Sequence, residues 1–447
     1  MPLNIQTRDL TPQQAMVIGF SIIILSGAIL LLLPISSASG KSIGWINALF
    51  TATSAVSLTG LTVVDIAPNL SLFGQAVILI LVKLGGLGFM LFGVMLALLL
   101  GKRITLKDRL LIQEATRAFS IQGMVKLVMY IVCISFLLEG LVAIILGFYW
   151  SPTLGWKQAT YKAIFHAISA FNNSGLSLYP NSLQAYVGDP VVNLCITSLS
   201  IIGGIGFTVL LDVYSNRSWK KLSLHTRIVL LTSGILMLTA FILILAIEWF
   251  NPQTFKHLAW GNRLWAAWFQ AVAPRSSGFY TVGITAMRSP TLWLIMLLMF
   301  VGTATGSTGG GIKVNTFAVA VIGIINVTKG NKDVNIFKKR INYQLFVNAI
   351  VIILLASSII FLVTLLLTLI ENSSQANSMA VFFEVVSAFT TTGLSMGITP
   401  TLSSIGKLIL IATMFVGKIG PLTFAFALTS GSAETYIRYP EDKVLIG

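Results

Sequence analysis

The sequence predicts an all-α polytopic membrane protein. Three observations carry this prediction: the composition, a series of long apolar runs, and four short stretches that match one another. Of the 447 residues 55% are hydrophobic and only 10% are charged, with a mean hydropathy of +0.89. Soluble domains carry about 25% charged residues, and disordered chains combine few apolar residues with many charges. The composition therefore excludes both classes.

The long apolar runs predict eight transmembrane helices, because a bilayer-spanning helix needs about 20 mostly apolar residues. Between the members of each successive pair lies a shorter stretch with polar ends, which predicts a re-entrant loop that dips into the membrane and returns. The predicted spans are 16–35, 72–100, 124–149, 190–214, 227–249, 290–326, 343–370 and 404–430, and the four short stretches are 45–60, 160–176, 264–279 and 379–394.

The four short stretches form an internal repeat. Phe50 precedes Gly60 by ten residues, and the second and fourth stretches have the same spacing and a Ser-Ala pair between Phe and Gly. The third stretch is one residue shorter and carries Pro274-Arg275. The glycines stand at positions 60, 175, 278 and 393, and such fourfold helix–loop–helix repetition suits a single pore.

The repeats define the predicted organisation of the chain. A cytoplasmic N-terminus occupies 1–15, repeat 1 occupies 16–100, and repeat 2 with its preceding cytoplasmic loop occupies 101–214. Repeat 3 occupies 215–326, with a broken helix at 303–313, and repeat 4 occupies 327–430. A cytoplasmic tail covers 431–447.

The glycines are candidates for an ion selectivity filter. Backbone carbonyls can replace the hydration shell of a cation, and glycine permits the positive-φ backbone that points carbonyls at a pore. No Asp or Glu lies within the three residues before any of these glycines, so a carboxylate ring of the kind that divalent cations favour is missing. Close helix packing is the alternative role for one glycine, but it explains four matched positions poorly. The predicted ion-binding residues are Thr59, Gly60, Ser174, Gly175, Ser277, Gly278, Thr392 and Gly393.

The helices after the short stretches also match. Gly85-Gly86-Leu87-Gly88-Phe89 corresponds to Gly203-Gly204-Ile205-Gly206-Phe207, and Val416–Pro421 stands in the same place in the last repeat. Helix packing is the leading interpretation of these glycines. The third repeat has five glycines between 302 and 311, which predicts a broken helix because each glycine costs about 1 kcal/mol of helix stability. Such backbone is tolerated at membrane depth only inside protein or beside water, so this segment should lie beside the permeation path.

Charge and tryptophan placement predict the orientation. The basic stretches 101–126, 215–227 and 329–340 belong in the cytoplasm by the positive-inside rule, together with both termini. Eight of nine tryptophans then lie on the outer side, as an aromatic belt requires. The net charge of +15 therefore reflects orientation in a cell membrane, and no nucleic acid partner is expected.

Several charged residues fall inside the apolar runs. Lys313 and Lys418 could each pair with a carbonyl or acidic group or form a positive barrier to ions, and the barrier or gate role is favoured. Lys83 has no evident partner, Glu139 is expected near a helix end in a paired or interfacial role, and Glu384 is expected to hydrogen-bond beneath the filter.

These residues resemble the membrane subunits of Ktr potassium uptake systems, in the Trk/Ktr/HKT superfamily, over nearly the whole chain. The specific pieces are 171–175, 274–279, 303–313 and 419–424. The resemblance implies that the filter glycines bind K⁺ at their carbonyls and that Lys418 is a pore barrier, although the family usually has Arg there. The family also commonly has alanine at the position of Ser174. The gate that it implies consists of Gly306, Ser307, Thr308, Gly309, Gly310, Gly311 and Lys313.

The resemblance also implies partners and function. The chain would form a homodimer with one pore per protomer, above a cytosolic ring of RCK-type nucleotide-binding regulatory subunits. K⁺ would be the substrate and Na⁺ an activator, and the chain itself would bind no cofactor. A sodium-conducting member of the same fold is the alternative, although Gly60 favours potassium. An intramembrane enzyme is not expected, because the sequence offers no nucleophile–base or metal set.

Overall fold

The computed structural model describes residues 12–88, 124–331, 333–371 and 377–428. Most of the predicted cytoplasmic N-terminus, the end of the predicted span 72–100 and the first basic loop lie outside the described residues. The predicted C-terminal tail 431–447 lies outside them as well.

Four long helices are the main candidates for membrane spans. They are α1 (Pro12–Leu32), α7 (Met124–Leu154), α11 (Leu224–Glu248) and α15 (Tyr343–Ile370). Length and composition qualify these four in the described part of the chain, and a fifth is added if a bent helix pair counts as one span. Only 17% of the most apolar window of α15 is buried, so most of its apolar surface faces outward, as lipid contact requires. The fold is that of a helical membrane protein, and the count of eight helices stays a prediction.

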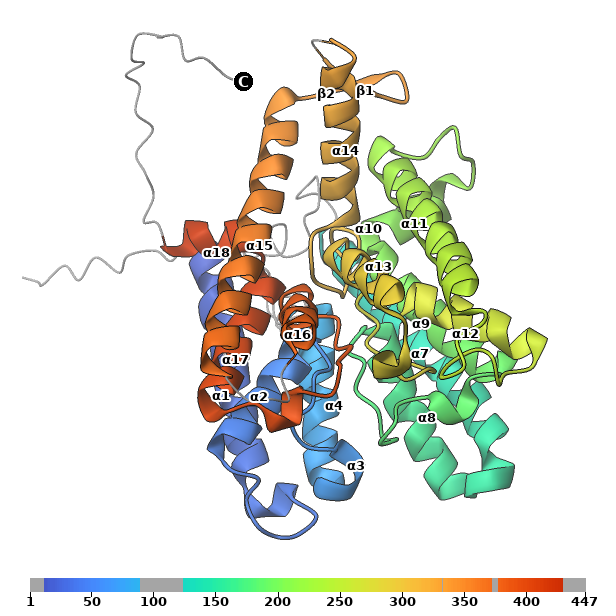
Figure 1. The fold of residues 1–447 in the computed structure, drawn as a ribbon, viewed down its shortest axis with the longest axis vertical. Helices are drawn as coiled ribbons and strands as arrows, with labels where there is room; N and C mark the ends of the chain where they lie inside the picture. Colours follow the sequence, from blue (N-terminus) through green and yellow to red (C-terminus); the bar gives the residue numbers. More distant parts are fainter. Residues whose placement is uncertain (1–11, 89–123, 332, 372–376, 429–447) are drawn as a thin grey trace, which may run out of the picture.

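A short helix follows each long one and packs against it (Figure 1). At 1.5 Å per residue, each of these short helices is shorter than the ~30 Å hydrocarbon core of a bilayer. These helices are α2 (Trp45–Ser57), α8 (Trp156–Phe171), α12 (Trp260–Val272) and α16 (Ser378–Thr390).

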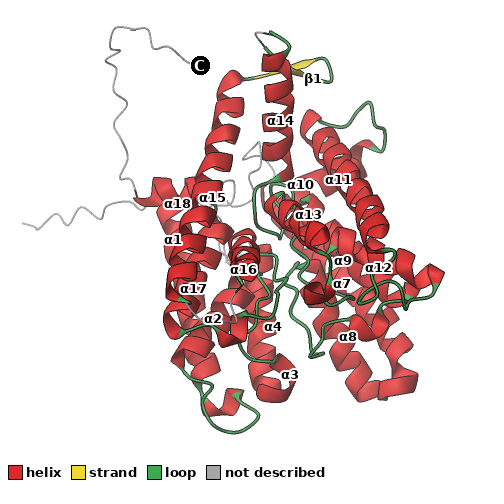
Figure 2. Cartoon of the chain, in the orientation of Figure 1, coloured by secondary structure: helices red, strands yellow, loops and turns green. Residues whose placement is uncertain are grey.

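Each short helix is followed by a further apolar helix that returns past it. These are α4 (Leu72–Leu87), α9 (Pro190–Ile205), α13 (Ser289–Phe300) and α17 (Ser404–Ile419). Figure 2 shows the connecting loops gathered in the middle of the molecule, surrounded by helices. A single turn, α3 (Ile66–Asn69), lies in the first of these connections.

Two of the predicted spans are bent where a straight helix was expected. The span 190–214 breaks at Gly206, where φ is +99°, and α10 (Phe207–Asn216) leaves at 93° to α9. The span 404–430 breaks at Gly420, where φ is +94°, and α18 (Pro421–Leu428) begins with a proline that suits a first helical turn. The expectation of unbroken helices is therefore wrong here, because a glycine of positive φ cannot continue a right-handed helix.

A β-hairpin extends beyond the helices at the top of Figure 1. After α14 (Val314–Thr328), β1 (Val334–Ile336) pairs antiparallel with β2 (Lys339–Ile341). Phe337 and Lys338 both have positive φ, as a two-residue hairpin turn requires. The sequence predicted only a basic loop in this region.

Candidate functional site

The loop after each short helix carries the same backbone signature. The four predicted filter glycines have φ between +68° and +88°. The residue two positions earlier is also left-handed in every loop, although none of the four is a glycine. These residues are Leu58, Asn173, Ser276 and Thr391, with φ between +51° and +62°. The fourfold repeat in the sequence is therefore a fourfold repeat of backbone conformation.

The four glycines form a closed ring in chain order. A Cβ atom at Gly60 would collide with the carbonyl of Ser174, and one at Gly175 would lie 2.5 Å from the Cα atom of Gly278. A Cβ atom at Gly278 would lie 2.6 Å from the Thr392 carbonyl oxygen, and one at Gly393 would collide with the Thr59 carbonyl. Backbone meets backbone at each step, so no side chain fits at these positions.

The residues before the glycines are buried, and their hydroxyls bond to other hydroxyls. Thr59 contacts the Ser57 hydroxyl at 2.7 Å, and Ser174 contacts that of Ser169 at 2.9 Å. Ser277 and Thr392 contact the hydroxyls of Ser200 and Thr390, each at 2.9 Å. The side chains of this predicted set are thus held within the protein, while the glycines line a cavity.

A serine on three of the short helices, which the repeat pattern did not single out as functional, braces the loop. The carbonyls of Ser54, Ser169 and Ser387 accept the N–H of the residue five positions later, at 2.8 to 2.9 Å. Ser54 and Ser169 also donate their hydroxyls to the carbonyl after the glycine, each at 2.7 Å. The Ser-Ala pairs were the signal that could have revealed them. In the shorter third loop the equivalent bond spans four residues, from Ser277 N–H to the Ala273 carbonyl.

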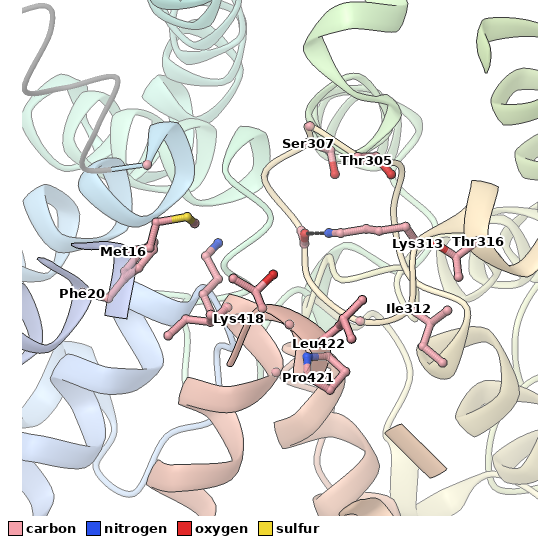
Figure 3. Close-up of a pocket in the computed structure, with 18 of the residues that line it drawn as sticks. Met16, Phe20, Thr305, Ser307, Ile312, Lys313, Thr316, Lys418, Pro421 and Leu422 are labelled. Carbon is pink, nitrogen blue, oxygen red and sulfur yellow. Dashed lines mark hydrogen bonds between the residues drawn. The ribbon is translucent and has the colours of Figure 1, made fainter. Parts of the chain in front are cut away.

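Two cavities in the described part of the molecule bear on the site, and the ring lines one of them. The first, of about 260 Å³, is lined by all four glycines. The second, of about 380 Å³, is lined by the glycine-rich ends of α4 and α17 and by residues 305–313 (Figure 3). Lys313 and Lys418 also line this second cavity, and Figure 3 shows them approaching from different helices.

The glycine-rich segment of the third repeat is non-helical between Phe300 and Val314. It docks onto the break in the second repeat: the N–H groups of Ala304 and Thr308 donate to the carbonyls of Gly204 and Gly203, at 3.0 and 3.2 Å. In return the carbonyl of Gly306 accepts the N–H of Phe207 at 2.9 Å. The segment thereby satisfies backbone groups that the two helix ends leave free.

Arg275 donates to the Gly302 carbonyl at the start of this segment, at 3.2 Å, and three further side chains bind it at Thr308 and Gly309. Lys313 donates to the Gly309 carbonyl at 2.6 Å, and Lys418 donates to the Thr308 carbonyl at 3.0 Å. The third is Asn173 of the second filter loop, whose amide donates to the Thr308 hydroxyl at 2.9 Å. Of the two roles considered for the lysines, carbonyl pairing is present, and it leaves the barrier role open.

Packing explains the first glycines of the matched helices, as expected. Cβ atoms at Gly85, Gly203 and Gly417 would collide with the carbonyls of Val56, Phe171 and Phe389, at the ends of three short helices. The last glycine of each set has positive φ and ends its helix. The first glycine of each set therefore permits close packing on a short helix, and the last glycine ends its own helix.

Lys83, which had no partner in the sequence analysis, pairs with Glu139. Its ammonium lies 2.6 Å from Oε1 and 2.5 Å from the Ser135 hydroxyl. Glu139 also accepts the Asn172 amide at 3.0 Å, so this buried pair supports the second filter loop from behind. Glu139 lies in the middle of α7 and not near its end, which corrects the predicted position. Glu384 accepts hydroxyls from Ser395 at 3.0 Å and from Thr399.

Known proteins resemble this chain over almost its full length. The sequence profile of the TrkH family, described as cation transport protein, matches residues 4–436. The chain belongs to the TrkH family of cation transport proteins. This membership agrees with the expectation of a transporter and not an enzyme.

Three curated relatives and one solved structure show how near the match is. The chain is 45% identical to Ktr system potassium uptake protein B of Bacillus subtilis, over 98% of this chain and 97% of that protein. It is 39% identical to the protein of the same name from Vibrio alginolyticus, over 96% and 94%, and 35% identical to potassium/sodium uptake protein NtpJ of Enterococcus hirae, over 98% of each. The crystal structure of the potassium transporter TrkH from Vibrio parahaemolyticus matches the fold with a TM-score of 0.73 at 18% identity, covering 95% of this chain and 86% of that one.

Proposed function

We propose that this chain is the membrane subunit of a potassium uptake system and that its ring of four glycines is the selectivity filter. The ring is the observation that carries the proposal. Four backbones approach so closely that side chains are excluded, and none of the four loops places a carboxylate next to its glycine. Carbonyl oxygens in such an arrangement suit a dehydrated monovalent cation.

Potassium is favoured over sodium by the names of the relatives at 45% and 39% identity. The relative named potassium/sodium uptake protein supports sodium as a second ion or as an activator. Ktr system proteins are named as parts of a system, which supports a further protein component as a partner. The RCK-type ring, the homodimer and the cytoplasmic termini are parts of this proposal.

The segment from Gly306 to Gly311, together with Lys313 and Lys418, is the proposed gate. It lies beside the larger cavity and is bound to the second filter loop through Asn173. Hydrogen bonds hold this segment to the second repeat, and its closest packing on the fourth filter loop is against the side chain of Thr391. Contacts of this kind can change at lower cost than the backbone-to-backbone contacts of the ring.

Ion uptake by filter variants tests the proposal. A bacterium lacking its own potassium uptake receives the chain with a co-expressed regulatory subunit, and growth is measured from micromolar to millimolar K⁺, with and without Na⁺. Wild type should restore growth. Gly60→Ser and Gly393→Ser should lower the preference for K⁺ over Na⁺ by at least about tenfold, because a Cβ at these positions displaces a carbonyl of the next loop.

Gly140→Ser is the matched control, because a Cβ at Gly140 meets no atom within 4 Å. It should leave selectivity unchanged. Unaltered discrimination in both filter variants, at normal protein levels in the membrane, would contradict the filter assignment.

A further inference from the structure

The smaller cavity carries a second ring beyond the glycines. The residue two positions after each filter glycine also lines this cavity, and each of the four has a hydroxyl group. They are Thr62, Ser177, Tyr280 and Ser395. The Ser395 hydroxyl donates its proton to Glu384 and accepts the Gly397 N–H at 2.9 Å, which leaves one lone pair of its oxygen available as an acceptor. Neutral oxygens from all four repeats therefore surround the approach to the glycine ring.

Asp65 is the single charged residue among those that line this cavity. It immediately precedes α3, but its carboxylate makes no capping hydrogen bond to that helix. No ion pair of Asp65 occurs among the described residues. The other three repeats have Pro180, Gly283 and Ile398 at the same distance from their glycines, so the fourfold pattern is broken here by one negative charge.

This combination fits one class of ligand. A carboxylate attracts cations, but divalent ions in protein sites take six to eight oxygens, usually from several carboxylates. One carboxylate with four hydroxyls is a weaker site, suited to a monovalent ion. A volume of about 260 Å³ leaves room for several water molecules around that ion.

We infer that Asp65 and the four hydroxyls form an outer cation site, where partly hydrated monovalent cations collect before they dehydrate in the glycine ring. This inference rests on the proposed function, because it assumes that ions pass the ring. The site raises the local cation concentration and therefore acts on the apparent KM more than on the maximal rate.

Uptake kinetics of Asp65→Asn test this site. Uptake of radioactive rubidium, a potassium analogue, is measured in the same bacterium at low and at physiological ionic strength, with choline chloride as the added salt. At low ionic strength the apparent KM should rise about three- to fivefold, the effect of one unit charge a few ångströms away in water. At physiological ionic strength, where the Debye length is about 8 Å, partial screening over this distance should reduce the rise to about two- to threefold.

Two further variants test whether the rise in KM depends on the negative charge at position 65. Asp65→Glu keeps the charge and should retain the KM of the wild type. Asp333→Asn removes one negative charge beside β1, at the opposite end of Figure 1 from α3, where Asp333 pairs with Arg340. It should leave the KM unchanged.

Three results would overturn the inference: an unchanged KM in Asp65→Asn, a rise that is equal at both ionic strengths, or the same rise in Asp333→Asn. Failure of the proposed function would look different. Wild-type cells would then take up no more rubidium than cells without the chain, and both proposals would fall together.

Discussion

The four loops that form the glycine ring share one backbone conformation. The segments that follow the returning helices α4, α9, α13 and α17 do not. All four loops share two left-handed positions, and three of them share the same five-residue hydrogen bond. Of the segments, α4, α9 and α17 each end at one glycine of positive φ, whereas α13 is followed by non-helical backbone up to Val314.

On the proposed function, this difference separates a fixed filter from an adjustable gate. The ring is held by backbone contacts that leave no room for a Cβ atom. The long segment of the third repeat is packed against side chains such as Thr391, and hydrogen bonds from its own Lys313, from Lys418 of α17 and from the second filter loop hold it. An ion filter needs constant geometry and a gate needs two positions, so the repeat that departs from fourfold symmetry is where regulation is expected.

The largest effect should come from breaking the buried pair behind the second loop. Lys83→Met and Glu139→Leu each leave one buried charge without its partner, and each should lower the free energy of unfolding by about 3–5 kcal/mol. The double variant should lose less than either single one. Thermal unfolding in detergent and K⁺/Na⁺ selectivity of the folded fraction are the measurements.

The exposed pair Arg340–Asp333 supplies the control for this prediction. Its side chains are 72% and 44% exposed, so Arg340→Ala should cost at most about 1 kcal/mol. If Glu139→Leu cost no more than this, Glu139 would not support the filter loop.

The next largest effect should come from removing the adjustable part. Deletion of 304–311 takes away the Thr308 and Gly309 carbonyls that accept the two ammonium groups. Hydrogen bonds to charged groups contribute about 1.5–3 kcal/mol each, so ion flux should rise at least about tenfold. Rubidium uptake at matched expression measures it. A well-expressed deletion variant with unchanged flux would count against a gate.

A smaller effect is expected from removing the hydrogen bond between the second filter loop and the third-repeat segment. Thr308→Val removes the hydroxyl that accepts the Asn173 amide but keeps the side-chain volume. The Thr308 hydroxyl also donates to the Gly203 carbonyl at 3.2 Å, so the variant loses both of these neutral hydrogen bonds. At about 1 kcal/mol each, their loss should raise the flux at least about fivefold. Thr305→Val is the control, because the Thr305 hydroxyl donates only to Asn315, also in the third repeat, at 2.7 Å. Equal flux in the two variants would show that the Asn173 contact does not hold the segment.

The sequence predicted the ring better than its surroundings, for a physical reason. The glycines repeat in register because each position excludes a Cβ atom, and the match among the four repeats makes that constraint visible in the sequence. The partner of Lys83 lies 56 residues away on another helix, so only the packing of α4 on the second repeat reveals Glu139. The breaks at Gly206 and Gly420 were missed because the glycines of these runs were all assigned to helix packing. Their common place, three residues after the packing glycines at 203 and 417, was the available signal.

The smallest expected effect is the difference between alanine substitutions at two of these helix breaks, Gly206 and Gly420. Gly206 and Gly420 have nearly the same φ, +99° and +94°, so alanine at either position should cost about 1–3 kcal/mol of backbone strain. A Cβ atom at Gly206 would also lie 2.8 Å from the Thr305 carbonyl oxygen, whereas one at Gly420 meets nothing within 4 Å. Gly206→Ala should therefore lower the unfolding temperature in detergent slightly more than Gly420→Ala, and it should raise flux because it pushes the third-repeat segment outward. Raised flux in Gly420→Ala alone would place the adjustable part in the fourth repeat and reverse the comparison.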